Sequence, residues 1–532
     1  MESYYRGSMR RFASAVFRFL LCIAALSLLS CTDDSSDDDL FNATFEDPVP
    51  LTAAEVQGIV QAAAESIDDG NLCIAVVDRV GRILAVWRRD PTTPVSELNK
   101  TVSVARAAAF LSSSQGPLTS RTLEYISTFH FPPQFGNPTP LPFATLPPQR
   151  ATVGVDRTAQ GPLWQIFASN RGAPFAGFIP GQEIPAATNI DGSAPSPGLS
   201  YLPGAVPLYK PDVMGAGLRV VGAVGCYDPG PGTPNVSAME FAALSGGNGF
   251  LLPGIPPEGA IFLVGQLLPN VVQIARPTGF GAGAFDPAGF FVPPTAGGSD
   301  PVGWIIGPLA DPLLNLSQND VMRIVDQGVN TANATRAAIR LPLGSTTKMV
   351  FAVTNLDGVI LGAFRMPDAP VFSFDVSITK ARAVVYYSGP NLLPADAIPG
   401  VPLGTAITTR TLGFLSQPFF PPTIDGRVAG PLFDVAVQNQ DPAQFDRMGA
   451  LPSSALRSGI IFFPGSAPLY NMAGQLIGGA GVSGDGVEQD DFVTAGAVRG
   501  FEPPLAIRAD NYTFGGVRLP YLKFPQLPGP GG

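Results

Sequence analysis

The sequence predicts an α+β protein built from two related halves, each an antiparallel sheet with helices packed on it. Of the 532 residues 45% are hydrophobic and only 14% are charged, which is too apolar for a disordered chain. One series of segments occurs twice, about half a chain apart. In each copy two β-rich runs joined by a tight turn lie between helical patterns, and strands joined in this way pair antiparallel.

Each copy begins with an amphipathic helix. The stretches "LTAAEVQGIVQAAAESI" and "LSQNDVMRIVDQGVNTA" start at Leu51 and Leu316. In both, Thr52 or Ser317 is followed three positions later by an acidic residue, the pattern of a capping box. Apolar residues then recur at helical spacing, so one face of each helix is expected to be buried.

The following segments match in the same order. The strand pair "LCIAVVDRVGRILAVWR" corresponds to "MVFAVTNLDGVILGAFR", and a second helix follows in which Arg106 aligns with Arg382. The stretch "TSRTLEYISTFHFPP" corresponds to "TTRTLGFLSQPFFPP". The late matches are 202–230 with 463–486, which carry "PLY" strands, and 265–271 with 516–522.

Proline- and glycine-rich segments separate the matched parts. Unmatched loops cover about 134–200 and 423–458, and long ordered loops often carry binding residues. Residues 274–312 form a linker that is apolar enough to be expected to pack along a domain surface. The predicted domains are therefore residues 51–273 and 313–526.

The N-terminus carries a targeting signal. Arginines precede the short apolar run "FLLCIAALSLL", which predicts a cleaved signal peptide at residues 1–30. The run ends in "LLSC", which resembles a bacterial lipobox, so Cys31 is expected to be acylated and residues 31–50 to form an acidic tether. By the same resemblance, Thr32 after the cysteine favours the outer membrane, and the predicted location is the cell envelope, facing the periplasm or the cell surface. The alternative is an ordinary secreted protein with a chance cysteine.

Charge and cysteine content exclude some functions. The net charge is −10 and the basic residues are not clustered, so no nucleic-acid partner is expected. Once Cys22 is removed with the signal and Cys31 is acylated, Cys73 and Cys226 remain. With no CxxC, no covalent haem motif and no cluster of cysteine and histidine, no metal site is predicted.

The segments resemble the GlcG/HbpS-like family of haem-binding or haem-degrading domains. The resemblance rests on "AVVDRVGRILA" and "AVTNLDGVILGAFR", on "TKARAV" (379–384) and on "GSAPLYNMAGQLIGGAGVSGDGVEQDDFVTAG" (465–496). It covers most of residues 51–526, and copy two is the closer match. Copy one has "GCYDPGPGTPNVSAMEFA" and lacks the Glu-Gln-Asp run of 488–490.

The resemblance implies a fold, an assembly and a ligand. The fold would be profilin-like, with a five-stranded antiparallel sheet flanked by helices in each domain. The fused copies would form an intramolecular pseudo-dimer, and further oligomers are compatible with the family. The implied ligand and cofactor is haem or a related small molecule.

The resemblance also implies a disulfide. In this fold the first and last strands are antiparallel neighbours, Cys73 starts the first strand and Cys226 ends the last. The aligned residues in copy two are Val350 and Val482, an apolar pair. A Cys73–Cys226 disulfide in the oxidising compartment is therefore expected.

His130 is the only histidine and a candidate axial ligand or proton carrier. The competing interpretation is packing, because Phe419 aligns with it in copy two. Tyr209 and Tyr470, from the "PLY" segments, are candidate phenolate ligands or buried packing residues. The ligand-binding set is His130, Arg121, Tyr209, Arg382 and Tyr470.

The repeated arginines and the acidic run also have two interpretations each. Arg121 and Arg410, like Arg106 and Arg382, could hold a haem propionate or form internal salt bridges. Glu488, Asp490 and Asp491 could bind a cation or act as acid and base, but the pattern favours carboxylates that cap a helix.

The predicted function is that of a lipid-anchored, extracytoplasmic ligand-binding protein. The alternative is a structural or protein-interaction module of the cell envelope without catalysis, and a third possibility is an enzyme acting on a small substrate. No catalytic residue is assigned, because no nucleophile elbow accompanies the single histidine. The glycine-rich "GVSGDG" lacks a Walker lysine and is expected to be a turn.

Overall fold

A computed structural model describes residues 49–126, 190, 199–200, 202–212, 217–231, 234–263, 265–292, 302–417, 419–421, 427–433 and 460–523. These residues belong to one compact unit. We call the described residues up to 292 half 1 and those from 302 onward half 2. Cys31 and His130 lie outside the described residues.

Half 1 contains a five-stranded sheet with the strand order β3-β4-β1-β2-β7, in which neighbouring strands are antiparallel. A two-stranded ribbon, β5 with β6, lies outside this sheet. The elements are α3 (Ala53–Ser66), β1 (Cys73–Asp78), β2 (Ile83–Arg88), α4 (Val95–Leu111), α5 (Ser120–Ile126), β3 (Ala205–Pro211), β4 (Leu218–Tyr227), α8 (Val236–Gly246), β5 (Phe262–Leu263), β6 (Gln266–Leu267), η2 (Pro287–Gly289) and β7 (Phe290–Val292).

Half 2 repeats this arrangement, with the strand order β11-β12-β9-β10-β8 and the ribbon β13 with β14. The elements are β8 (Gly303–Ile306), α9 (Gln318–Asn333), β9 (Val350–Thr354), β10 (Ile360–Arg365), α10 (Ser373–Ser388), η3 (Pro394–Asp396), α11 (Thr409–Leu415), β11 (Ser466–Tyr470), β12 (Leu476–Ser483), α14 (Val487–Ala497), η5 (Leu505–Ile507), η6 (Ala509–Asn511), β13 (Thr513–Phe514) and β14 (Val517–Arg518). The predicted mixed α+β class with antiparallel sheets is confirmed.

Helices α3 and α9 begin where their capping boxes predict. The Glu55 N–H donates to the Thr52 hydroxyl at 3.2 Å, and the Thr52 N–H donates back to the Glu55 carboxylate at 2.7 Å. Ser317 and Asp320 make the same two bonds at 3.1 and 3.0 Å. Each box satisfies N–H groups that the first helical turn leaves without partners, which fixes the helix start.

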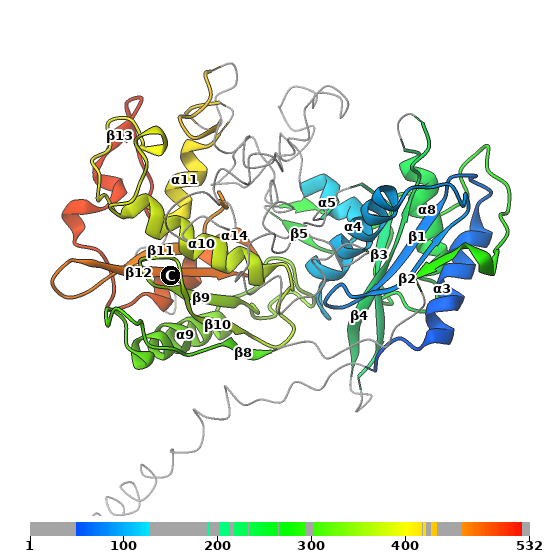
Figure 1. Ribbon diagram of the computed structural model, residues 1–532, viewed down its shortest axis with the longest axis horizontal. Coiled ribbons are helices and arrows are strands. Elements are labelled where there is room, and N and C mark those ends of the chain that lie inside the picture. Colours follow the sequence, from blue (N-terminus) through cyan, green and yellow to red (C-terminus); the bar gives the residue numbers. More distant parts are fainter. Residues whose placement is uncertain are drawn as a thin grey trace, which may run out of the picture. The chain divides into compact units, whose positions relative to one another are not determined.

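The sheet of half 1 is covered on both faces, with α3 and α8 on one and α4 on the other (Figure 1). Cys226 belongs to the core cluster formed with α3 and α8. Gly225, the preceding residue, faces α4, because an added Cβ there would overlap Ala105 of that helix. Alternate residues of β4 thus meet different layers, as strand geometry requires. In half 2, α9 packs against α14, and α10 contacts β12 and β9.

The segment predicted as a linker supplies an edge strand to each sheet. Strand β7 pairs with β2, and β8 pairs with β10. The Trp87 indole N–H donates to the Asp286 carbonyl at 2.8 Å, and the Trp87 ring stacks on Phe285 with centroids 6.2 Å apart. Aromatic residues of the segment therefore pack on the domain that precedes it.

The repeated "RTL" segment forms a short helix in each half, α5 and α11. Each helix is hydrogen-bonded to what we call the tail of the same half, residues 265–271 in half 1 and 516–522 in half 2. Thr122 Oγ1 donates to the Pro269 carbonyl at 2.6 Å, and Thr411 Oγ1 donates to the Pro520 carbonyl at 2.7 Å. The recurrence of the segment is thus explained by a structural contact that both halves make.

The predicted disulfide is wrong, because both thiols are free and buried. Strands β1 and β4 are antiparallel neighbours as expected, but Cys73 pairs with Tyr227, and Cys226 pairs with Ile74. Residues opposite each other share a face, so a register offset of one residue places the two thiols on opposite faces of the sheet. Half 2 has the same register, with Val482 opposite Phe351.

Hydrogen bonds also connect the two halves. The Asp368 carboxylate accepts from the Ser114 N–H at 2.9 Å and from the Ser114 hydroxyl at 2.8 Å. The same carboxylate pairs with Arg340 at 2.6 Å. The Leu341 N–H donates to the Gln115 carbonyl at 2.8 Å. Among the described residues no helix is both long and apolar enough to cross a bilayer.

Candidate functional site

Arg121 and Arg410 form equivalent internal salt bridges. Arg121 Nε lies 2.9 Å from Glu240, and Arg410 Nε lies 2.8 Å from Asp491. Both acidic residues occupy the fifth position of their helix, α8 or α14. Copy one therefore keeps one carboxylate of the acidic run, which the sequence comparison missed because Glu240 stands where copy two has aspartate.

Arg106 and Arg382 hold the tight turns of the first strand pair. Arg106 Nε donates to the Gly81 carbonyl at 3.0 Å, and Arg382 Nε donates to the Gly358 carbonyl at 2.8 Å. Burial lowers the pKa of Arg106 to about 9. The guanidinium groups of both buried arginines thus contact the backbone of their own half.

The two "PLY" tyrosines are buried, and burial raises the pKa of each phenol. The Tyr209 hydroxyl donates to the Ser113 carbonyl at 3.0 Å. The Tyr470 hydroxyl has no hydrogen-bond partner within the described part of the chain. Tyr209 also lines a pocket, described below.

The acidic run begins α14, but its carboxylates do not cap that helix. The N-cap is Gly486, with φ 143°, and it makes no side-chain cap bond. Asp491 pairs with Arg410, and Glu488 lies 2.7 Å from Lys523 and 3.1 Å from Arg410. The cap prediction is wrong, because these carboxylates pair with cations from other segments instead.

Asp490 pairs with Lys380 in the interior of half 2. The Lys380 Nζ lies 2.8 Å from the Asp490 carboxylate and donates to the Val482 carbonyl at 2.8 Å. The same Nζ lies 4.5 Å from the centroid of the Phe463 ring, within cation–π range. The two side chains are 0% and 3% exposed. Burial raises the pKa of Asp490 to about 7 and lowers that of Lys380.

Half 1 has Val104 and Met239 at the positions of Lys380 and Asp490. An added Cβ at Gly204 would lie 3.0 Å from the Met239 Cβ, and one at Gly465 would lie 2.7 Å from the Asp490 Cβ, so the helix positions correspond. Sequence reasoning missed the pair, although a lysine inside a helix that is buried on every side was a signal for it.

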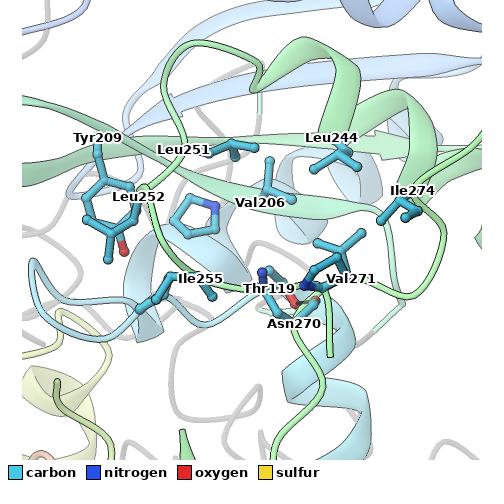
Figure 2. Close-up of a pocket in the computed structure, with 13 residues that line it drawn as sticks. Thr119, Val206, Tyr209, Leu244, Leu251, Leu252, Ile255, Asn270, Val271 and Ile274 are labelled. Carbon is cyan, nitrogen blue, oxygen red and sulfur yellow. Dashed lines mark hydrogen bonds between the residues drawn. The ribbon is translucent and has the colours of Figure 1, made fainter. Parts of the chain in front are cut away.

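Half 1 contains a pocket of about 210 Å³ between β3, the start of α5, the end of α8 and the tail (Figure 2). Tyr209 and Ile274 lie at opposite ends of the pocket in Figure 2, with Thr119 and Asn270 between them. None of the residues around it is charged, so the wall suits a neutral group. The lining residues are Pro117, Thr119, Val206, Pro207, Tyr209, Leu244, Leu251, Leu252, Ile255, Pro257, Asn270, Val271 and Ile274.

Among the described residues no group of three or more histidine, cysteine, aspartate or glutamate side chains is placed to hold a metal ion.

Two solved structures are similar to part of the chain. The crystal structure of a PduOC–haem complex is 22% identical and covers 36% of this chain and 96% of its own, with a TM-score of 0.22. The structure of Klebsiella pneumoniae protein ORFY is 21% identical and covers 34% of this chain and 88% of its own, also with a TM-score of 0.22. No curated protein matches.

The matched family lies in half 2. The model described as haem degrading protein HbpS-like matches residues 316–499, which run from the residue before the α9 capping box to two residues past the end of α14. This span holds the Lys380–Asp490 and Arg410–Asp491 pairs. Residues 316–499 of the chain therefore form an HbpS-like domain.

Proposed function

We propose that this protein binds a small molecule, with haem as the first candidate, and that both halves are profilin-like domains paired within one chain. The observation that carries the proposal is the match of residues 316–499 to a family described as haem degrading. Half 1 repeats the strand order and tail contacts of half 2, which supports extending the family to it.

The described pocket does not suit haem. Its volume is about 210 Å³, below the usual range of about 300–1,000 Å³ for pockets that enclose drug-sized ligands. Its lining has no imidazole, thiolate or thioether for the iron and no cation for the propionates, and the Tyr209 hydroxyl is held by the Ser113 carbonyl. We therefore place no haem there and propose His130 as the axial ligand, because its imidazole is the only one in the chain.

A hemin titration tests this proposal. We expect a shifted Soret band for the purified protein and its loss in His130→Phe, which installs the residue that half 2 has at the aligned position. Phe419→His is the matched control, and Tyr470→Phe tests the buried phenol as an alternative ligand. No shift with the unaltered protein would exclude haem as the ligand. A shift retained by His130→Phe would show that His130 is not the axial ligand.

We further propose that Cys31 is acylated and holds the protein at the outer membrane, with residues 31–50 as a tether. The support is the lipobox-like "LLSC" and the acidic segment that follows it. Labelled palmitate should appear in the protein and be absent from Cys31→Ser, while Cys22→Ser should remain labelled. Label retained by Cys31→Ser would contradict the anchor.

A further inference from the structure

The two halves make the same backbone contact to the edge strand of their sheet, β3 in half 1 and its counterpart β11 in half 2. The Tyr209 N–H donates to the Phe250 carbonyl at 2.6 Å, and the Tyr470 N–H donates to the Phe501 carbonyl at 2.8 Å. The loop that follows α8 or α14 therefore returns to the same place on the edge strand in each half. The residues that lie beside this contact therefore occupy corresponding positions in the two halves.

The connection after the second helix differs between the halves. In half 1 the Ser112 hydroxyl accepts from the Leu118 N–H at 2.9 Å and closes a short loop at 113–117. In half 2 the Ser388 hydroxyl accepts from the Ile407 N–H at 2.9 Å, but the enclosed loop is 389–406. Half 2 thus has more chain available to cover the corresponding space.

Half 2 uses this chain and one aromatic side chain to fill the space. The Tyr521 carbonyl accepts from Thr408 Oγ1 at 2.6 Å, and the Asn270 carbonyl accepts from Thr119 Oγ1, so these two residues correspond. Tyr521 is 5% exposed and belongs to a core cluster that includes Ile398 and Ala406 of the long loop. In half 1 a pocket remains, because the loop is short and asparagine replaces the ring.

The polar groups of the half-1 pocket define what can enter. The Thr119 hydroxyl donates to the Asn270 carbonyl and the Tyr209 hydroxyl to the Ser113 carbonyl, so both donors are used. Asn270 lines the pocket, and its carboxamide makes no hydrogen bond within the described residues. No lining side chain is charged, which excludes a carboxylate or an ammonium group from the interior.

We propose that this pocket binds a neutral, phenol-sized aromatic molecule. Its ring would occupy the space that the Tyr521 ring occupies in half 2, and its polar group would meet the Asn270 carboxamide. A cavity of about 210 Å³ is large enough, since an apolar cavity of about 150 Å³ holds benzene. None of the lining residues is the proposed axial ligand, and the proposal goes beyond the haem function.

The test uses p-cresol, which is the tyrosine side chain as a free molecule. Calorimetry and ligand-observed NMR on the purified chain should show saturable binding at one site. Asn270→Tyr supplies the side chain of half 2 and should weaken binding at least tenfold. Asn248→Tyr is the matched control, because Asn248 is exposed in the same half and outside the pocket, and it should bind as the unaltered protein does.

A second variant and a second ligand keep the test decisive. Ile274 lines the pocket and is 58% exposed, so Ile274→Trp should fold and still narrow the pocket, with at least tenfold weaker binding. p-Hydroxybenzoate should bind at least tenfold more weakly than p-cresol, because its carboxylate finds no cation. No saturable p-cresol binding, or binding unchanged in both pocket variants, overturns the proposal. Hemin spectra recorded on the same samples report separately on His130.

Discussion

Removing either partner of the Lys380–Asp490 pair should destabilise half 2 strongly, whereas removing both should not. The two side chains are 0% and 3% exposed, so neither charge can be rehydrated when its partner is lost. Breaking a buried pair in this way costs about 3–5 kcal/mol, against about 0–1 kcal/mol for a surface pair. Lys380→Val also removes the bond to the Val482 carbonyl and the contact with Phe463.

The double variant carries the residues that half 1 has at these positions, Val104 and Met239. Replacement of a buried ion pair by apolar side chains of similar volume is often neutral or stabilising by about 1–4 kcal/mol. We therefore expect Lys380→Val with Asp490→Met to unfold within about 2 kcal/mol of the unaltered protein. Independent effects would instead add to about 6–10 kcal/mol.

Urea unfolding at pH 8, followed by tryptophan fluorescence and far-ultraviolet circular dichroism, measures all four members of this cycle. The coupling energy is the departure of the double variant from the sum of the single ones. A double variant destabilised by the full sum would refute the argument. Val104→Lys with Met239→Asp in half 1 is the reciprocal control, and it should destabilise because it introduces two buried charges.

Three further predictions concern charge and redox state. Arg410→Met should lower the free energy of unfolding by about 3–5 kcal/mol, and Arg121→Met by less, because the Arg410 side chain is 2% exposed and that of Arg121 is 17% exposed; equal losses in urea unfolding would contradict the burial argument. Cys73 and Cys226 should both be alkylated after unfolding without a reductant, and a linked peptide in mass spectra would restore the disulfide. Burial raises the pKa of Asp490 to about 7, so between pH 4 and 7 the folded state holds a proton that the unfolded state releases. Stability relative to Asp490→Asn should therefore fall as pH rises through this window, by at most about 4 kcal/mol, and pH-independent differences in urea midpoints would argue against it.

The regular elements of the fold could be predicted from the sequence because their signals are local. The capping boxes at Thr52 and Ser317 and the spacing of apolar residues define α3 and α9 without knowledge of the tertiary structure. Strands β7 and β8 could not be found in this way, since they are short and lie in a segment rich in proline and glycine. Such strands form only because an edge of a sheet is present to pair with them.

The chemistry of the buried charges depended on tertiary contacts. Lys380 and Asp490 are 110 positions apart, so no local pattern joins them. The cysteine prediction identified the right pair of strands, and a register offset of one residue made the bond impossible. The pocket beside Asn270 was missed because it depends on what half 1 lacks, namely the long loop and the Tyr521 ring of half 2.

The edge strands of the linker show where the chain can be divided. Hydrogen bonding assigns Phe290–Val292 to the sheet of half 1 and Gly303–Ile306 to that of half 2. A gene split between these strands would leave each product with all five strands of its sheet. A split at residue 274 or 312 would take an edge strand from one product and expose unpaired backbone groups on β2 or β10. The unit that could have been duplicated, expressed alone or exchanged between proteins therefore includes part of the linker.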